Sequence, residues 1–366
     1  MKKLLPIVAL ALCSTIGHAQ VHTTSWKIKT SAALDAMCLL NTLTGDSYYR
    51  QFYPNDYHEW TSRLKSENNK AIKSIYKMKT KRGVTMSAFI TFMLGYNPDT
   101  TVSQLYDRFN SNFSSIKQQL KQSDNFNMLH WLYFRSYKKE LTEYLYLLRS
   151  VNFDSIYYKE TEPNIRYYID SLKNRIESFN VIPQIESFFG GKIGSDTITL
   201  FLLRYNQPYG ISIGNNRYIT YYKYDISLYV KNAIHEVLHK PVNRFLADQP
   251  YYKLLKKDPF IYSAFANHDK NFGYNRFNAA IEEACVRFLD QVISERIGVA
   301  IDARQRWKEQ DKGMHVFAAI LYQVYLETKD QNLNFKDILA KASEQCAKVG
   351  GKAIYEKLYA DGATNS

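Results

Sequence analysis

One five-residue stretch, His235-Glu236-Val237-Leu238-His239, constrains this chain most strongly. Two histidines four positions apart lie on one face of a helix, about one turn above each other. Both imidazoles can then reach one Zn²⁺ ion at the roughly 2.0–2.1 Å that zinc–nitrogen bonds need. Glu236 follows the first histidine, so its carboxylate can reach a water on the metal instead of the metal itself. The stretch predicts a helix that carries the active site of a zinc hydrolase splitting amide bonds.

The residues around this stretch favour a buried helix. Asp225 is a suitable N-cap, and apolar residues recur after it at helical spacing: Ile226, Val230, Ala233, Ile234, Val237 and Leu238. The residue before a proline avoids the α region, so Pro241 is expected to end the helix at about His239 or Lys240. The two histidines therefore fall in the last turns of a helix that faces the core.

Strand-forming segments precede the helix. Thr197 to Tyr205 is an apolar, β-branched run, and residues 209–214 and 217–222 read as two strands joined by a tight turn at Asn215-Asn216. Strands followed at once by a metal-bearing helix suggest a small sheet packed against it. An edge strand of that sheet could hold an extended peptide by main-chain pairing.

A catalytic zinc site needs a third protein ligand, with water completing four-coordination. The helical pattern from Asn278 to Leu289 carries two adjacent acids, Glu282 and Glu283. Adjacent helix positions point about 100° apart, so only one of the two can face the metal, and the apolar periodicity does not decide which. His268, in a predicted loop, is the competing ligand.

These motifs resemble those of the gluzincin zinc metallopeptidases, in which a glutamate from a later helix joins His-Glu-x-x-His. The resemblance favours Glu283 as the third ligand, with Glu282 as its predecessor and Arg287 as a partner one turn on. The chain is also similar to secreted bacterial zincin-like proteins grouped as a domain of unknown function. That similarity includes Lys240-Pro241-Val242-Asn243 directly after the histidines. It implies a zincin-like catalytic lobe and a Zn²⁺ cofactor without naming a substrate.

A mechanism follows from these assignments. Zn²⁺ lowers the pKa of bound water towards about 7, and Glu236 is expected to accept its proton as general base and pass it to the leaving amine. A further donor should stabilise the developing oxyanion. His315, Tyr274 and Tyr322 are the candidates for that role.

The N-terminus predicts export. Lys2-Lys3 gives a basic start, Leu4 to Leu12 an apolar stretch, and small residues end at Ala19, so residues 1–19 read as a cleaved Sec-type signal peptide. The apolar stretch is too short to span a bilayer, and no later segment approaches the required length. We expect a periplasmic or extracellular protein without a transmembrane segment after cleavage.

The expected fold class is α+β and mainly helical, in two lobes. Residues 20–185 form a helical N-terminal lobe, with helices expected at Ala32–Leu43, Glu59–Leu64, Ala71–Tyr76, Met86–Leu94, Val102–Phe109, Leu129–Leu148 and Ile165–Ser178. Three glycines between Phe188 and Asp196 mark the junction. Residues 186–360 form the catalytic lobe, ending in helices at Val316–Leu326 and Phe335–Leu358, and residues 361–366 form a flexible tail.

Net charge and cysteine content limit the kinds of partner and the disulfides that we expect. The formal charge is +13, and cleavage after Ala19 removes two lysines, so 46 − 35 leaves +11. An excess of lysine and arginine with 15% aromatic residues could suit an anionic surface, a glycan or an acidic substrate, although a solvated basic surface is the simpler interpretation. Nucleic acid is not expected as a partner, because residues 1–19 predict export and no base-reading motif occurs. Cys38, Cys285 and Cys346 remain after cleavage; a Cys38–Cys346 disulfide would join the two ends, and Cys285 is expected as a small buried residue.

Two classes of function fit this sequence. The first is a secreted zinc-dependent peptidase acting on peptides or proteins, with His235, His239 and Glu283 as ligands and Glu236 as base. The second is a non-catalytic exported protein that binds glycan, peptide or a cell-surface polymer on the same scaffold. An intact Glu236 favours the enzyme, because a binding protein has no need of that carboxylate.

Overall fold

The computed structural model describes residues 23–360 except 66–68, 83–89, 91–93, 96, 122–125, 127, 209, 248 and 271–273. The expected signal peptide, the expected tail and most of the expected helix Met86–Leu94 lie outside the described residues. The described chain is mainly helical with one four-stranded sheet, which confirms the expected α+β class. Within this part of the chain, no helix has the length and apolar content to cross a membrane.

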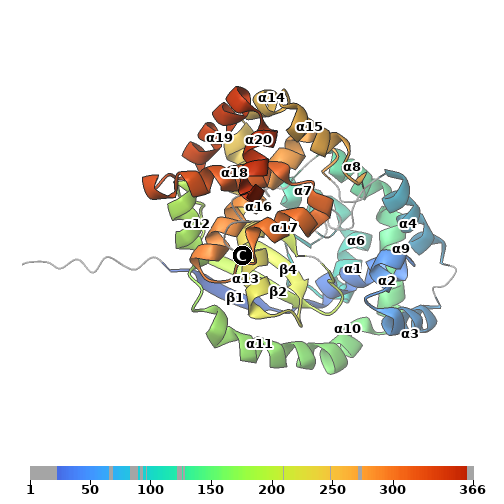
Figure 1. Cartoon of the computed structure of the whole chain (residues 1–366). Coiled ribbons are helices and arrows are strands. Elements are labelled where there is room, and N and C mark those ends of the chain that lie inside the picture. Colours follow the sequence, from blue (N-terminus) through green and yellow to red (C-terminus); the bar gives the residue numbers. More distant parts are fainter. Residues whose placement is uncertain are drawn as a thin grey trace, which may run out of the picture.

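The helices fall into two groups along the chain (Figure 1). The earlier group is α1 (Ala32–Leu43), α2 (Ser47–Arg50), α3 (Pro54–Leu64), α4 (Lys70–Arg82), α6 (Val102–Ser111), α7 (Phe113–Lys121), α8 (Met128–Ser136), α9 (Lys138–Ser150) and α10 (Phe153–Ile156). The later group is α11 (Glu162–Ile176), α12 (Val181–Phe189), α13 (Ile226–Ala247), α14 (Tyr251–Leu255), α15 (Pro259–Ala266), α16 (Phe277–Arg296), α17 (Ala303–Glu309), α18 (Val316–Glu327), α19 (Phe335–Val349) and α20 (Gly351–Ala360). A π-helical turn at Tyr157–Thr161 connects the two groups.

The sheet joins distant parts of the sequence. Its strands are β1 (Ser25–Lys29), β2 (Thr197–Leu203), β3 (Ile211–Gly214) and β4 (Arg217–Tyr221), in the order β1-β2-β4-β3. β2 is parallel to both of its neighbours, and β3 pairs antiparallel with β4. Asn215 and Asn216 both have positive φ, as the expected tight turn requires. The hairpin and β2 are therefore confirmed, whereas the sequence did not predict β1.

Two hydrophobic cores lie on opposite faces of this sheet. Along β2, Ile198, Leu200 and Leu202 enter a core with the later helices, and Phe201 and Leu203 enter a core with the earlier ones. Strand alternation thus buries both faces. We call these the C-terminal and N-terminal cores. Helix α11, which falls within the expected N-terminal lobe, and α12, which spans the expected boundary at residue 185, both contribute their apolar faces to the C-terminal core.

The helix that carries the two histidines is longer than expected. Asp225 caps its start, since the Leu228 N–H donates to Asp225 Oδ1 (3.0 Å). The predicted end before Pro241 was wrong, because α13 continues to Ala247. Proline removes one backbone donor, but the buried side chains of Val242 and Leu246 extend the apolar face into the C-terminal core and outweigh that loss.

Two other expected helices are divided. Leu129–Leu148 forms α8 and α9, separated by a tight turn at Tyr137 that no breaker residue marks. Phe335–Leu358 forms α19 and α20, because Gly350 adopts a φ of 82° that side chains disfavour. The three cysteines of the described residues, Cys38, Cys285 and Cys346, are buried and free, so the possible Cys38–Cys346 disulfide is not formed; these two thiols belong to different cores. Cys285 is buried, as expected.

Candidate metal centre

Two packed helices, α13 and α16, build the candidate site. α13 presents His235 and His239 one turn apart. α16 presents Glu283 and, at helical spacing on the same side, Arg287 and Asp290. Apolar residues on both helices hold the pair in the C-terminal core, so the polar side chains between them are held on a rigid support.

The structure brings His235, His239 and Glu283 together, with one ligand atom from each within 4.8 Å of the others. The two Nε2 atoms are 3.2 Å apart. Glu283 Oε1 lies 3.6 Å from His235 Nε2, and Oε2 lies 3.8 Å from His239 Nε2. Ligands about 2.05 Å from a tetrahedral ion are separated from each other by about 3.3–3.4 Å. The three side chains therefore fit a small divalent ion.

Glu283 is a buried carboxylate that keeps its charge. Only 1% of the residue is exposed, and among the described residues neither oxygen accepts a hydrogen bond of normal geometry. The expected partner Arg287 is present, with Nε 2.7 Å from Oε1. Burial alone raises the pKa of Glu283, but Arg287 and the neighbouring imidazoles outweigh it and lower the pKa to about 2. The site thus holds a buried, ionised carboxylate.

The two alternative ligands lie elsewhere. Glu282 accepts a hydrogen bond from the Tyr252 hydroxyl (2.7 Å), on the side of α16 that faces α14. His268 has its Nδ1 2.5 Å from the carbonyl oxygen of Phe265 and stacks on that ring. Neither belongs to the group of ligand atoms around the two histidines.

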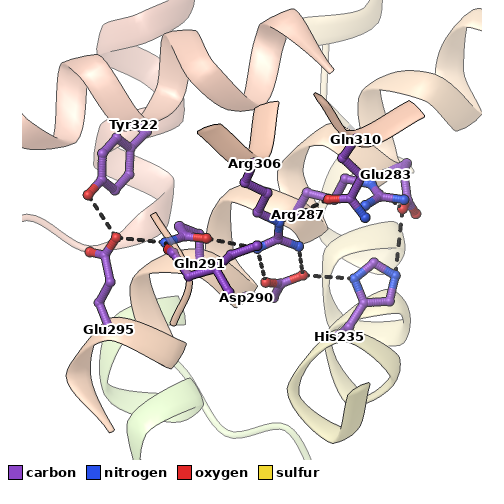
Figure 2. A network of polar contacts seen from close by, with 10 residues as sticks. His235, Glu283, Arg287, Asp290, Gln291, Glu295, Arg306, Gln310 and Tyr322 are labelled. Carbon is purple, nitrogen blue, oxygen red and sulfur yellow. Dashed lines mark hydrogen bonds and ion pairs between the residues drawn. The ribbon is translucent and has the colours of Figure 1, made fainter. Parts of the chain in front are cut away.

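A buried ion pair behind His235 was missed by the sequence analysis (Figure 2). Asp290 Oδ2 lies 2.9 Å from His235 Nδ1, and Arg306 on α17 pairs with both oxygens of Asp290. Asp290 lies seven residues after Glu283, two helical turns on the same face, so the spacing alone could have identified it. Nothing local in the sequence pointed to Arg306.

The two imidazoles experience different electrostatic environments. Burial lowers the pKa of His235, but the carboxylates of Glu283 and Asp290 outweigh it, so the net shift is upward. Burial and the neighbouring His235 lower the pKa of His239. Metal binding requires neutral imidazoles with free Nε2 lone pairs. The lowered pKa of His239 favours the neutral ring that binds metal. The carboxylates next to His235 favour its protonated ring, so metal binding there must displace a proton.

The three candidates for oxyanion stabilisation are separated by the structure. Tyr274 is close enough to Glu283 and Glu236 that burial and those carboxylates raise the pKa of its hydroxyl well above the usual value. Its ring contacts His315 at 6.3 Å between centroids, and His315 is buried beside Glu283. Tyr322 instead donates to Glu295 (2.7 Å). Tyr274 and His315 thus border the metal centre, and Tyr322 does not.

The Tyr274 backbone is unusual. Its φ is 55°, in the left-handed region that tyrosine rarely adopts. Strained backbone of this kind is concentrated at functional sites, where surrounding structure holds it in place. This conformation aims the ring at the carboxylates of the site.

Comparison of the chain with known protein families, with characterised proteins and with solved structures found no match. The resemblance to gluzincins therefore remains a prediction from the two motifs. The geometry of the side chains carries the functional argument.

Proposed function

We propose that this protein is a zinc-dependent peptidase with His235, His239 and Glu283 as ligands and Glu236 as general base. The observation that carries the proposal is the close approach of those three ligand atoms, two from α13 and one from α16. Two imidazoles and one carboxylate are a donor set that zinc accepts in catalytic sites. Glu236 lies between the two histidines in the sequence and is partly exposed, so solvent can reach its side chain.

The chain's own residues divide the chemistry among them. Zinc bound at the site supplies a Lewis acid that lowers the pKa of water and polarises a carbonyl. With zinc held by His235, His239 and Glu283, Glu236 would be placed to accept a proton from water and to return it to the leaving amine nitrogen. The Tyr274 hydroxyl, with its raised pKa, stays protonated at neutral pH and can donate to the developing oxyanion.

The position of β3 supports a peptide as the substrate. β3 is the last strand in the sheet order, so one of its edges is unpaired within the described residues. The residues that lead into β3 pack against α13. A Cβ at Gly210 would lie 3.2 Å from Nδ2 of Asn232, which is one turn before Glu236 on that helix. An extended peptide pairing with this edge would run beside the helix that carries the ligands.

The basic N-terminus motivates the proposal that the enzyme is exported. The N-terminal residue of the protein recovered from the periplasm or medium checks this, and Gln20 is the expected result. Recovery of the protein with Lys2 and Lys3 still attached would contradict it.

The function is tested by zinc content and peptide cleavage of the purified mature chain. Wild-type protein should contain about one zinc and cleave members of a mixed peptide library. Glu236→Gln should keep its zinc and lose on the order of 10²–10⁴-fold in kcat, because only the proton acceptor is removed. Cleavage at the wild-type rate by this variant would exclude the mechanism.

Glu282→Gln is the matched control. It changes a neighbouring glutamate that is hydrogen-bonded to Tyr252 and lies outside the ligand group. Its activity and zinc content should match the wild type. Stoichiometric zinc without cleavage of any library peptide would favour the alternative, a non-catalytic binding protein.

A further inference from the structure

The guanidinium of Arg306 makes several hydrogen bonds near the site, and the ligand set does not explain its role. Its side chain is 9% exposed. Nη1 donates to Asp290 Oδ1 (2.5 Å) and Gln291 Oε1 (3.0 Å), Nη2 to Asp290 Oδ2 (2.8 Å) and Nε to Gln310 Oε1 (3.0 Å). Arginine has five N–H groups, so four of them are used. Such a guanidinium has a single orientation.

The neighbouring amide is also fixed. Gln291 Nε2 donates both to Glu295 Oε1 (2.9 Å) and to the Ile301 carbonyl (2.8 Å), so its oxygen must face Arg306. Glu295 in turn accepts from Tyr322 (2.7 Å). Figure 2 shows this continuous series of contacts, from Tyr322 through Arg306 to His235. Side chains of α16 and Gln310, in the 3-10 turn after α17, therefore hold the guanidinium in place, and Tyr322 of α18 supports them through Glu295.

The bidentate ion pair determines what Asp290 can do. Charge-assisted fork pairing with arginine keeps a carboxylate ionised, and an ionised carboxylate only accepts hydrogen bonds. His235 Nδ1, 2.9 Å from Asp290 Oδ2, must therefore be the donor. The neutral ring then carries its lone pair on Nε2, the atom that faces His239 and Glu283.

We propose that Arg306 is a positioning residue for the metal centre, acting through Asp290 to hold His235 in the tautomer and orientation that present Nε2 to the ion. This inference rests on the proposed metal site but not on peptide cleavage. Outer partners of this kind contribute about 10–100-fold to metal affinity. A purely structural ion pair would stabilise the fold equally with or without metal.

Metal affinity tests the proposal, measured by competition between the protein and a chelator for zinc. Arg306→Met keeps the length of the side chain and removes every donor. It should weaken zinc binding by about 10–100-fold. Arg306→Lys should recover part of the loss, because one ammonium can pair with only part of the carboxylate.

Arg304→Met is the matched control. Arg304 lies on the same short helix and donates from Nε to the Leu358 carbonyl (2.8 Å), away from the metal centre. Its loss should change the zinc dissociation constant by less than about threefold while costing stability of the metal-free protein. Equal zinc affinity in Arg306→Met and Arg304→Met would overturn the positioning role.

A second variant guards against misfolding. Arg306→Met alone leaves Asp290 buried without its cation, which is strongly destabilising. The double variant Asp290→Asn with Arg306→Met removes both charges and should fold, yet show the same loss of zinc affinity. A double variant with wild-type affinity would contradict the proposal.

The tautomer of His235 can be read without metal, from the ¹⁵N chemical shifts of its ring above the titration of the imidazole. The metal-free wild type should carry the proton on Nδ1, and the double variant should show a mixture. If the wild-type protein binds no zinc, the proposed function and the positioning role both fail, and the tautomer measurement then shows only whether Arg306 fixes the His235 ring. If zinc binds but no peptide is cleaved, the inference stands without the peptidase.

Discussion

Two buried carboxylates, one on each side of the sheet, have pKa values that are shifted in opposite directions. Asp35 is fully buried in α1, where its oxygens accept from the backbone N–H groups of Arg204 (3.0 Å) and Tyr205 (2.8 Å). Burial outweighs these bonds and raises the pKa of Asp35 to about 7. Glu283 is just as buried, yet Arg287 and two imidazoles lower its pKa to about 2.

The difference lies in the partners. The guanidinium of Arg204 binds Asp56 (2.6 Å), so Asp35 has backbone donors and, among the described residues, no ion pair with a cation. Through its two backbone hydrogen bonds, Asp35 connects α1 to the residues that follow β2. Glu283 has a cation in contact and stays charged in the interior. A carboxylate that stays charged out of water is suited to holding a cation, whereas one that readily takes up a proton is suited to a structural role.

The largest expected effect is on metal binding at Glu283. Glu283→Gln should weaken zinc binding by on the order of 10³-fold, about a third of the free energy that a structural zinc site provides. Chelator competition measures this, with Glu282→Gln as control. A variant that kept wild-type affinity would show that Glu283 is no ligand and would make its charge purely structural.

The next largest expected effect is a change in the free energy of unfolding with pH, caused by Asp35. Its pKa is about 7 in the folded protein and near 3.8 in the unfolded chain, so the folded state binds the proton more tightly. The stabilisation of the folded protein by the proton on Asp35 is fully present below pH ~4 and is lost as pH rises towards 7. At 1.36 kcal/mol per pKa unit, the free energy of unfolding should fall by up to about 4 kcal/mol over that range.

Asp35→Asn should remove this fall, as measured by urea unfolding between pH 4 and 8. Asp107→Asn, on the exposed surface of α6, is the control and should keep the wild-type slope. An unchanged slope in Asp35→Asn would mean that Asp35 is ionised throughout, and the contrast with Glu283 would disappear.

The smallest effect concerns the glutamate beside Glu283. Tyr252→Phe removes the hydrogen bond to Glu282 and should lower the free energy of unfolding by about 1 kcal/mol, measured by urea unfolding. Zinc affinity should not change. A loss of zinc in this variant would mean that Glu282 positions α16 at the metal and that the two glutamates act together.

Local patterns in the sequence predicted what depends on nearby residues. The turn residues Asn215 and Asn216 identified the hairpin, and the spacing of His235 and His239 placed them on one helix face. The choice of Glu283 over Glu282 came from resemblance, because the periodicity of α16, buried on most of its surface, did not distinguish them. For the hairpin and for the histidine pair, the information lay within a few neighbouring residues.

Long-range contacts could not be predicted in the same way. The β1 residues Ser25 to Lys29 pair with a strand that begins 172 residues later, at Thr197 (197 − 25). The five residues of β1 mix polar and apolar types, and nothing in them indicates which strand they pair with. Pro241 is a local stop signal that packing across the core outweighs. Arg306 reaches Asp290 only because α17 folds back over α16.

The parallel pairing of β1 has a consequence for how the protein is made. The strand nearest the N-terminus is synthesised first, but its hydrogen-bonding neighbour emerges only after more than half of the chain has been translated. Because β2 lies between the two cores and contributes side chains to both, neither can reach its final packing on a nascent chain that stops short of it. Assembly must therefore wait for the middle of the polypeptide, and a chain arrested before Thr197 would lack the strand that contributes to both cores.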